Sequence, residues 1–141
     1  ILRYATVYGP GQHAGALSYF IREISKGRRA EIYGRKARDF VFVTDVVRAN
    51  LAALARAALP RDPVFNIASG RATELPELYA LVAKILKRPN NRPRILPAKA
   101  GEIDRFQLDI KKARRFLGWR PRVGLLPGLK ITMSAPRNRT R

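Results

Sequence analysis

The 141-residue sequence has no cysteine and a single histidine, His13. Without cysteine it can form neither disulfides nor thiolate metal sites, which is typical of a reducing compartment, and we expect a cytoplasmic location. A lone histidine without a nearby acidic cluster argues against a metal site. The longest apolar runs are too short to cross a bilayer, and no signal-peptide pattern opens the chain, so we expect no membrane association.

Acidic residues are scarce. Ten Asp and Glu stand against 29 Lys and Arg, which gives a formal net charge of +19. Clustered cations are typical of nucleic-acid binders, but here they are spread along the whole chain, and no stacking pattern of aromatic residues accompanies them. We interpret most of them as a solvated surface with some non-specific affinity for polyanions, strongest at the cluster 111–115. A basic nucleic-acid-binding module without catalysis stays open as an alternative.

The residues that are present alternate between strand-like runs and helical stripes, and 46% of them are hydrophobic, enough to build a core. The pattern predicts strands at 1–8, 30–33, 39–43, 64–67 and 95–96. It predicts helices at 15–27, 44–59, 109–117 and 125–133, and a further helix capped by Thr73. For the helix at 109–117 we expect Asp109 as its N-cap and Gly118 as its stop.

The stretch 38–50 organises the chain. Its first part alternates phenylalanine and valine from Phe40 to Val43, so both faces are apolar, as in a buried extended segment. Arg38 precedes this rigid segment, where a cation suits anion binding. An ordinary pairing of Arg38 with Asp39, or with another neighbour on the surface, is an equally good interpretation of the spacing.

The second part of this stretch has the features of a helix. Thr44 is the predicted N-cap, with Asp45 in the first turn, where the helix dipole favours a carboxylate. Apolar residues then recur at helical spacing, at Val47, Leu51, Leu54 and Ala58.

Five segments in order resemble one family, the extended short-chain dehydrogenases/reductases that act as NAD-dependent nucleotide-sugar epimerases and dehydratases. Segment 38–49, RDFVFVTDVVRA, resembles the signature RDF-x-x-V-x-D-V-x-x-A of that family. The others are LRYATVYGPGQ, VFNIASG, AKAGEI and LGWRPRV. Any one of these motifs is weak, but the ordered set covers the chain to about Lys130.

The resemblance implies an α/β fold: the C-terminal part of a Rossmann-type enzyme, with its small substrate-binding domain and the last elements of the NAD-binding sheet. We expect residues 1–133 to form this part and 134–141 to be a disordered basic tail. The sequence lacks a Gly-rich strand-to-helix loop, and no tyrosine is followed four residues later by lysine. In the family both features lie N-terminal to these motifs, so the chain looks like a fragment, with NAD bound mainly by the missing part.

The resemblance also implies a site for a nucleotide-diphosphate sugar. Arg38 matches the family arginine near the ribose-diphosphate, where a guanidinium can bind phosphate as a bidentate fork. Lys99 replaces an arginine that contacts the diphosphate, and Glu102 replaces an aspartate near the ribose. We expect Arg38 and Lys99 to converge on one pocket for the pyrophosphate.

The remaining expected contacts carry less weight. Thr6 stands where the family has a substrate-binding asparagine, and offers a hydroxyl in place of an amide. Tyr33 begins the turn that faces the nucleotide, and Phe106 stands where relatives place an aromatic, although packing explains Phe106 equally well. Backbone contacts are expected at Gly15 and Ala16, and weak cofactor contacts at Tyr4 and Val7.

The implied function is the nucleotide-sugar-binding half of a UDP-glucose 4-epimerase-like enzyme, homodimeric when intact. An NDP-sugar 4,6-dehydratase or decarboxylase of the same family is the alternative within this class. Because the catalytic tyrosine and lysine are absent, we expect no catalytic residue in this chain and no turnover by the chain alone. A truncated product without a stable fold is a third hypothesis.

Overall fold

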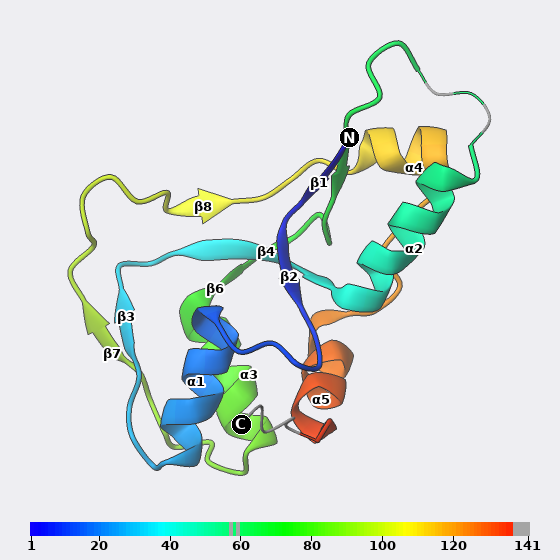
Figure 1. The fold of residues 1–141 in the computed structure, drawn as a ribbon. Helices are drawn as coiled ribbons and strands as arrows, with labels where there is room; N and C mark the ends of the chain where they lie inside the picture. Colours follow the sequence, from blue (N-terminus) through cyan, green and yellow to red (C-terminus); the bar gives the residue numbers. More distant parts are fainter. Residues whose placement is uncertain (57, 59, 137–141) are drawn as a thin grey trace.

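The structure is a computed structural model that describes residues 1–56, 58 and 60–136. Five helices and eight strands alternate along these residues, which confirms the α/β class (Figure 1). The helices are α1 (Gly15–Ser25), α2 (Val43–Leu54), α3 (Leu75–Ile85), α4 (Lys111–Leu117) and α5 (Leu125–Ser134). The strands are β1 (Leu2–Tyr4), β2 (Thr6–Tyr8), β3 (Glu31–Tyr33), β4 (Ala37–Phe42), β5 (Phe65–Ile67), β6 (Ala72–Glu74), β7 (Arg94–Leu96) and β8 (Arg105–Phe106).

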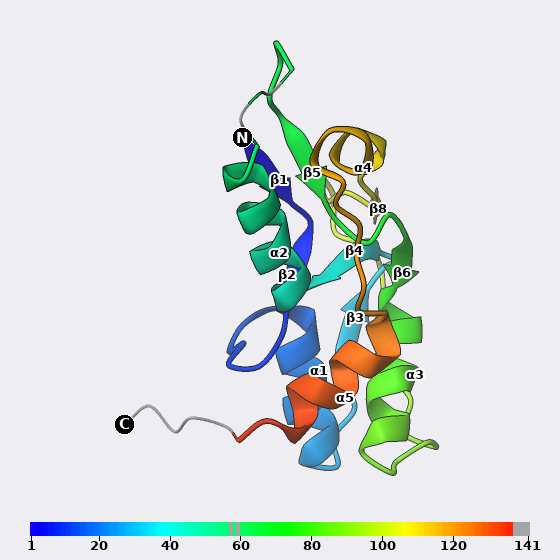
Figure 2. The same cartoon turned by 90° about the vertical axis from the view of Figure 1, so that its right-hand side faces the viewer.

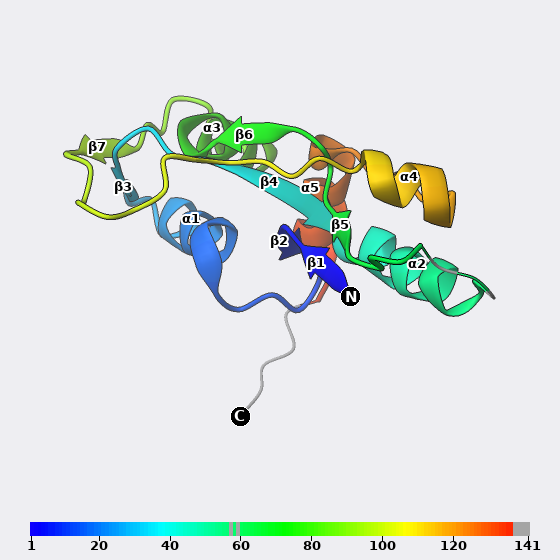
Figure 3. The same ribbon diagram turned by 90° about the horizontal axis from the view of Figure 1, so that it is seen from above.

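Strand β4 is the hub of the sheet structure. It pairs in parallel with β2 and β8, and antiparallel with β6. The remaining pairs, β1 with β5 and β3 with β7, are parallel. Seen from above, β4 crosses the molecule from the β3–β7 pair to the start of α2 (Figure 3). A strand with neighbours on both edges and helices on its faces must be apolar on both sides, as the sequence predicted.

Two hydrophobic clusters lie on opposite faces of β4. Phe40 and Phe42 belong to the larger cluster, with side chains of α1, α3 and α5 that include Phe20 and Tyr79. Val41 points the other way into a smaller cluster beneath α2 and α4. The helices accordingly form two groups, α1, α3 and α5 at one end and α2 with α4 at the other (Figure 2). The alternation of side chains along a strand therefore connects the two cores.

The helix after β4 corrects two expectations. It begins at Val43 with Phe42 as its N-cap and no side-chain cap, so Thr44 is not the cap. It ends at Leu54, and the predicted stripe faces outward: Val47, Leu51 and Leu54 are exposed, whereas Asp45, Val46 and Ala49 are buried. Helical spacing identified an amphipathic helix, but Val46 and Ala49 are the apolar residues that pack on the sheet.

The other helix ends are partly as predicted. Thr73 lies in β6, and α3 starts after Glu74 without a side-chain cap, so the predicted cap is wrong. Asp109 lies one residue before the N-cap of α4, yet its carboxylate accepts the N–H of Lys111 at 2.8 Å. Gly118 stops α4 in the left-handed conformation, as expected. Of the predicted tail, Ser134 belongs to α5, and residues 137–141 lie outside the described residues.

Two fully buried carboxylates fasten distant segments to the β4–α2 unit. Asp39 accepts hydrogen bonds from the backbone N–H and the hydroxyl of Ser69, at 2.8 and 2.6 Å, and from the N–H of Gly70 at 3.0 Å. Asp45 accepts the backbone N–H groups of Arg122 and Val123, both at 3.0 Å, and pairs with Arg48. Buried carboxylates are tolerated when hydrogen bonds of this kind satisfy their oxygens.

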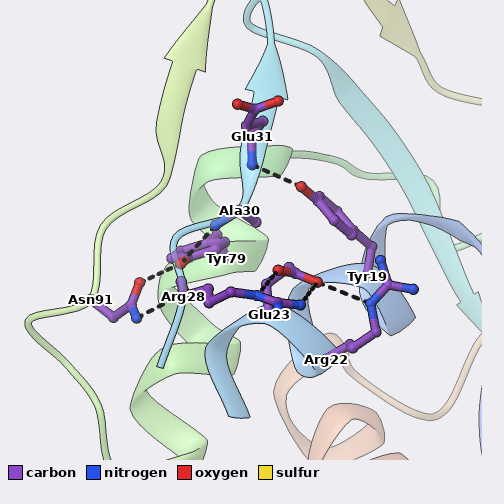
Figure 4. A network of polar contacts seen from close by, with 8 residues as sticks. All are labelled: Tyr19, Arg22, Glu23, Arg28, Ala30, Glu31, Tyr79 and Asn91. Atoms are coloured by element: carbon purple, nitrogen blue, oxygen red, sulfur yellow. Dashed lines mark hydrogen bonds and ion pairs between the residues drawn. The ribbon is translucent and has the colours of Figure 1, made fainter. Parts of the chain in front are cut away.

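A polar network joins the ends of α1 and α3 to β3 (Figure 4). Glu23 on α1 accepts hydrogen bonds from Arg28 at 2.7 and 3.0 Å and from Arg22 at 3.0 Å. These bonds stabilise the carboxylate and lower the pKa of Glu23 from its usual 4.5 to about 2. Tyr79 donates to Asn91, whose amide in turn donates to the carbonyl of Arg28 at 3.2 Å. The network holds the loop after α1 against the loop after α3.

None of the helices in the described part of the chain is long and apolar enough to span a membrane.

Replacing Asp45 should destabilise the fold strongly. In Asp45→Ala, the N–H groups of Arg122 and Val123 lose their acceptor in a covered position, which costs about 2–4 kcal/mol of unfolding free energy. Urea unfolding followed by circular dichroism measures this difference. The control Asp62→Ala removes an exposed carboxylate and should cost much less. Equal losses for the two variants would contradict the anchoring role of Asp45.

Protonation of Glu23 should reduce the stability of the fold as the pH decreases. Its pKa is lowered in the folded state, so its stabilising contribution is complete above about pH 4.5 and is lost as the pH falls towards about 2. We expect Glu23→Gln to flatten the dependence of unfolding free energy on pH across this window. The control Glu77→Gln, on the exposed side of α3, should alter the slope less. A wild-type slope in Glu23→Gln would show that the network does not depend on this charge.

Candidate functional site

Two adjoining loops carry two of the ten predicted site residues, Lys99 and Glu102, and three more lie on the strands that flank them, Tyr33 on β3, Arg38 on β4 and Phe106 on β8. The two loops are the turn 34–36 between β3 and β4, and the loop 97–104 between β7 and β8 (Figure 1). The N–H of Gly34 donates to Leu96 at 2.9 Å, and the N–H of Ala37 donates to Asp104 at 2.7 Å. Gly34 has φ +67°, and a Cβ there would lie 2.9 Å from Cβ of Ala98. Glycine thus permits both the turn and the close approach of the two loops.

Tyr33 and Lys99 are in direct contact across these loops. The ammonium of Lys99 lies 4.0 Å from the centre of the Tyr33 ring, within the range of a cation–π interaction. Lys99 is exposed and Tyr33 is half-buried. The ring therefore positions a charge that can still be reached from solvent.

Arg38 lies on β4 between two neighbours, opposite Thr73 of β6 and Phe106 of β8. Its Nη1 donates to the carbonyls of Ala37, at 2.8 Å, and Asp104, at 3.3 Å. Of the other interpretation of the sequence, the pairing with Asp39 is not observed, whereas Arg38 is bound to its neighbour Ala37. Successive side chains of a strand point to opposite faces, and the carboxylate of Asp39 is bound to Ser69 and Gly70.

In the part of the chain that the structure describes, the side chain of Arg38 makes its two hydrogen bonds through Nη1. Nη2 and Nε of the guanidinium have no partner there, so they can donate to an anion.

Glu102 forms an ion pair with Lys36, which is buried at 7% exposure. We predicted a ligand role for Glu102 but assigned no role to Lys36. A lysine covered to this extent requires a partner, so the pair fastens the loop 97–104 onto the turn 34–36. The two residues are 66 positions apart in the sequence. The signal that could have identified the pair is the coincidence of an unusual cation in the turn with the acid of the AKAGEI motif.

The other predicted residues lie outside these two loops. Thr6 lies on β2 and pairs with Phe40 of β4. Phe40 is two residues along β4 from Arg38. Gly15 begins α1, and Ala16 packs against the larger core. The hydroxyl of Tyr4 donates to Asn50 at 3.0 Å, and Val7 packs against the smaller core. The structure thus places Tyr33, Arg38, Lys99, Glu102 and Phe106 in the two loops or on the strands that flank them, and the remaining five on β1, β2 and α1.

In the part of the chain that the structure describes, two of the cavities have volumes of about 490 and 540 Å³, and neither of these two is lined by Arg38 or Lys99. The first lies between α1 and the end of α5, and includes His13. The second lies between β6, α3 and the segment 121–126. The expected pyrophosphate pocket therefore corresponds to neither of these cavities: Arg38 lies on β4, and Lys99 lies in the loop 97–104.

The residues suggested for NAD do not form a dinucleotide site by themselves. The hydroxyl of Tyr4 is bound to Asn50, and the side chain of Val7 is packed in a core. The sequence also supplies no Gly-rich turn to receive a pyrophosphate. Among the described residues, no group of three or more His, Asp or Glu side chains could hold a metal ion.

The largely parallel pairing around β4, with helices on both faces, defines the C-terminal portion of an extended short-chain dehydrogenase fold. The chain belongs to the NAD dependent epimerase/dehydratase family. The model of that family matches residues 1–68, which include β1 to β5.

Sequence similarity to known proteins covers the rest of the chain as well. A putative UDP-glucose 4-epimerase of Methanocaldococcus jannaschii is 36% identical over 151 aligned positions, covering 100% of this chain and 46% of that protein. The UDP-glucose 4-epimerase of Mycolicibacterium smegmatis is 35% identical, and the alignment covers 96% of this chain and 44% of that protein. This chain therefore spans less than half the length of these relatives.

Solved structures agree in fold. The UDP-glucose 4-epimerase of Thermotoga maritima, crystallised with UDP-glucose, has a TM-score of 0.81 and 39% identity, over 93% of this chain and 43% of that one. The UDP-glucuronic acid 4-epimerase of Bacillus cereus, in complex with UDP-glucuronic acid and NAD, has a TM-score of 0.84 and 29% identity. The match covers 93% of this chain and 42% of that one.

Proposed function

We propose that this chain supplies the nucleotide-sugar-binding part of a UDP-sugar 4-epimerase. The observation that carries the proposal is the contact of Lys99 with Tyr33, together with the hydrogen bond of Arg38 to Asp104, around two loops that are tied together through backbone hydrogen bonds. The similar proteins named above support the choice of substrate class, because each is named as a UDP-sugar 4-epimerase. Epimerisation therefore stands ahead of dehydration or decarboxylation for the whole enzyme.

Each residue of the assembly has a defined task in this proposal. Arg38 presents Nη2 and Nε to the diphosphate, where a planar guanidinium can donate two parallel hydrogen bonds. Lys99 adds a second positive charge, positioned by the ring of Tyr33. Lysine lacks the fork of arginine, so its contact is less directional. Phe106 lies beside Arg38 in the sheet and offers an apolar surface to the nucleoside.

These tasks amount to binding and orientation of the substrate. Holding the diphosphate at fixed points positions the attached sugar for a reaction carried out by other groups, which is a large part of enzymatic rate enhancement. The proposal does not assign hydride transfer or proton transfer to this chain. The tyrosine–lysine pair and the NAD site belong, in this proposal, to the rest of the whole enzyme. The homodimer expected from the family stays a prediction.

Removing the phosphate contacts should weaken the binding of UDP to the purified chain, as measured by isothermal titration calorimetry. Arg38→Ala loses charge-assisted hydrogen bonds and should weaken affinity about tenfold to a hundredfold. Lys99→Ala should have a smaller effect, and Lys99→Arg should bind at least as tightly as wild type because it regains the fork.

Two controls isolate the diphosphate. Arg114→Ala removes an equal charge from the exposed face of α4 and should leave UDP affinity nearly unchanged. Uridine, which has no phosphate, should bind Arg38→Ala and wild type equally. If Arg38→Ala and Arg114→Ala bound UDP with the same affinity, the assignment of Arg38 to the diphosphate would be wrong.

A further inference from the structure

Outside the candidate site, positive charge is concentrated at the ends of α1 and α3. The loops that follow these helices, 26–29 and 87–94, form one tip of the molecule, far from β1 and α2 in both side views (Figures 1 and 2). We call this surface the basic tip. It carries seven cations and no acidic residue of its own: Lys26, Arg28, Arg29, Lys87, Arg88, Arg92 and Arg94.

Hydrogen bonds hold the two loops of the basic tip together. The guanidinium of Arg29 donates to the carbonyls of Arg92, at 2.9 Å, and Pro93, at 3.3 Å. The amide of Asn91 donates to the carbonyl of Arg28 at 3.2 Å, and the N–H of Arg94 donates to Ala30 at 2.8 Å. The cations are therefore displayed on a fixed framework, and a ligand need not order the loops when it binds.

Carboxylates neutralise a minority of these charges. Among the described residues, Glu23 pairs with Arg28, and Glu31 lies 3.6 Å from Arg94. The other five cations of the basic tip have no carboxylate partner within the part of the chain that the structure describes. Their mutual repulsion destabilises the isolated chain, and a bound polyanion would relieve it.

Helix capping does not explain the cations. Positive side chains are favourable near helix C-termini because of the helix dipole. Here, however, backbone N–H groups of the following residues already satisfy the final carbonyls. Lys26, Gly27 and Arg28 donate into the last turn of α1, and Leu86, Lys87 and Arg88 donate into the last turn of α3. The side chains of the seven cations remain exposed. Among the described residues, those of Lys26, Lys87 and Arg88 make no hydrogen bond or ion pair.

We infer that the basic tip is a binding surface for the phosphate backbone of duplex nucleic acid. Five of its seven cations are arginines, whose guanidinium groups match phosphate geometry. The aromatic side chains nearest the tip are not displayed for base stacking: Tyr79 is buried, and the ring of Tyr19 is covered by Arg22 at 5.4 Å. Contact with regularly spaced phosphates therefore fits this surface better than stacking of unpaired bases.

The rival location is α4, which the sequence alone favoured. Its four cations are more fully neutralised, since Lys111 lies 3.6 Å from Asp109 and Lys112 lies 2.9 Å from Asp62. The two surfaces belong to different ends of the molecule (Figure 2). Removing three charges from each in turn separates a local binding surface from the general effect of the net charge.

The test measures the affinity of the purified chain for a labelled 20-base-pair DNA duplex of random sequence, by fluorescence anisotropy across a range of salt. In the tip variant, Lys26→Ala, Lys87→Asn and Arg88→Ala are combined. Asparagine is used at Lys87 because this residue has φ +57°, a conformation that asparagine tolerates. In the control variant, Lys111→Ala, Arg114→Ala and Arg115→Ala are combined. Circular dichroism checks that each variant is folded. If the triple tip variant does not fold, the single variant Arg88→Gln is tested in its place.

We expect wild type to bind the duplex with a Kd in the micromolar range at about 100 mM salt. The tip variant should lose more than about tenfold in affinity. The slope of the logarithm of its association constant against the logarithm of salt concentration should be smaller in magnitude by roughly two to three. The control should lose less than about threefold. Excess UDP-glucose should not displace the duplex.

Other results would overturn the inference. Equal losses in the two variants would mean that net charge alone drives binding, and a larger loss in the control would move the surface to α4. Absence of duplex binding by wild type would refute the inference directly. So would tighter binding to single-stranded DNA, or to vesicles containing anionic phosphatidylserine, since either would identify a different ligand.

Discussion

Two buried carboxylates must be satisfied by hydrogen bonds, and this requirement organises the fold around β4. Asp39 lies within the strand and Asp45 just beyond it, and both are fully buried. Asp39 binds the turn after β5, and Asp45 binds the segment that leads into α5. Since an unpaired carboxylate in such a position is costly, these distant segments are held where their N–H groups meet the oxygens. The packing of two separate cores follows from this arrangement.

The candidate site depends on the same strand. Because the carboxylate of Asp39 faces the turn at Ser69 and Gly70, the side chain of Arg38 is directed to the opposite face, beside Phe106. The loop 97–104 is then fastened by the pair of Lys36 with Glu102 and by the hydrogen bond from Ala37 to Asp104. Tyr33 and Lys99 meet as a result of these attachments. The positive charges of the site are thus placed by backbone pairing more than by direct contact between them.

The sequence predicted those parts of the structure that local patterns determine. The alternation in β4 and the helix α1 are as expected, and Leu17, Phe20 and Ile24 of that helix are buried. The outward stripe of α2 was not predicted, because spacing reveals that a helix is amphipathic but not which face is covered. The short strands β6 and β8 were missed as well. They have no pattern of their own and are extended because they pair with β4. The pairing of Lys36 with Glu102 joins residues far apart in the sequence and has no local signal.

The same limit applies to function. Motif identity indicated Arg38, Lys99 and their neighbours, and the structure places Arg38 on β4 and Lys99 in the loop 97–104, away from the two cavities described above. Composition gave the charge of the chain but not its distribution in space, which became visible only when the loops after α1 and α3 were seen to form one tip.

The most direct test of the nucleotide-sugar assignment is to titrate UDP-glucose into isotopically labelled chain and follow every backbone amide by NMR. We expect the amides of 33–38 and 97–106 to shift together with one affinity, while those of the basic tip stay in place. Shifts that avoid both loops, or that gather at the cavity beside His13, would contradict the assignment.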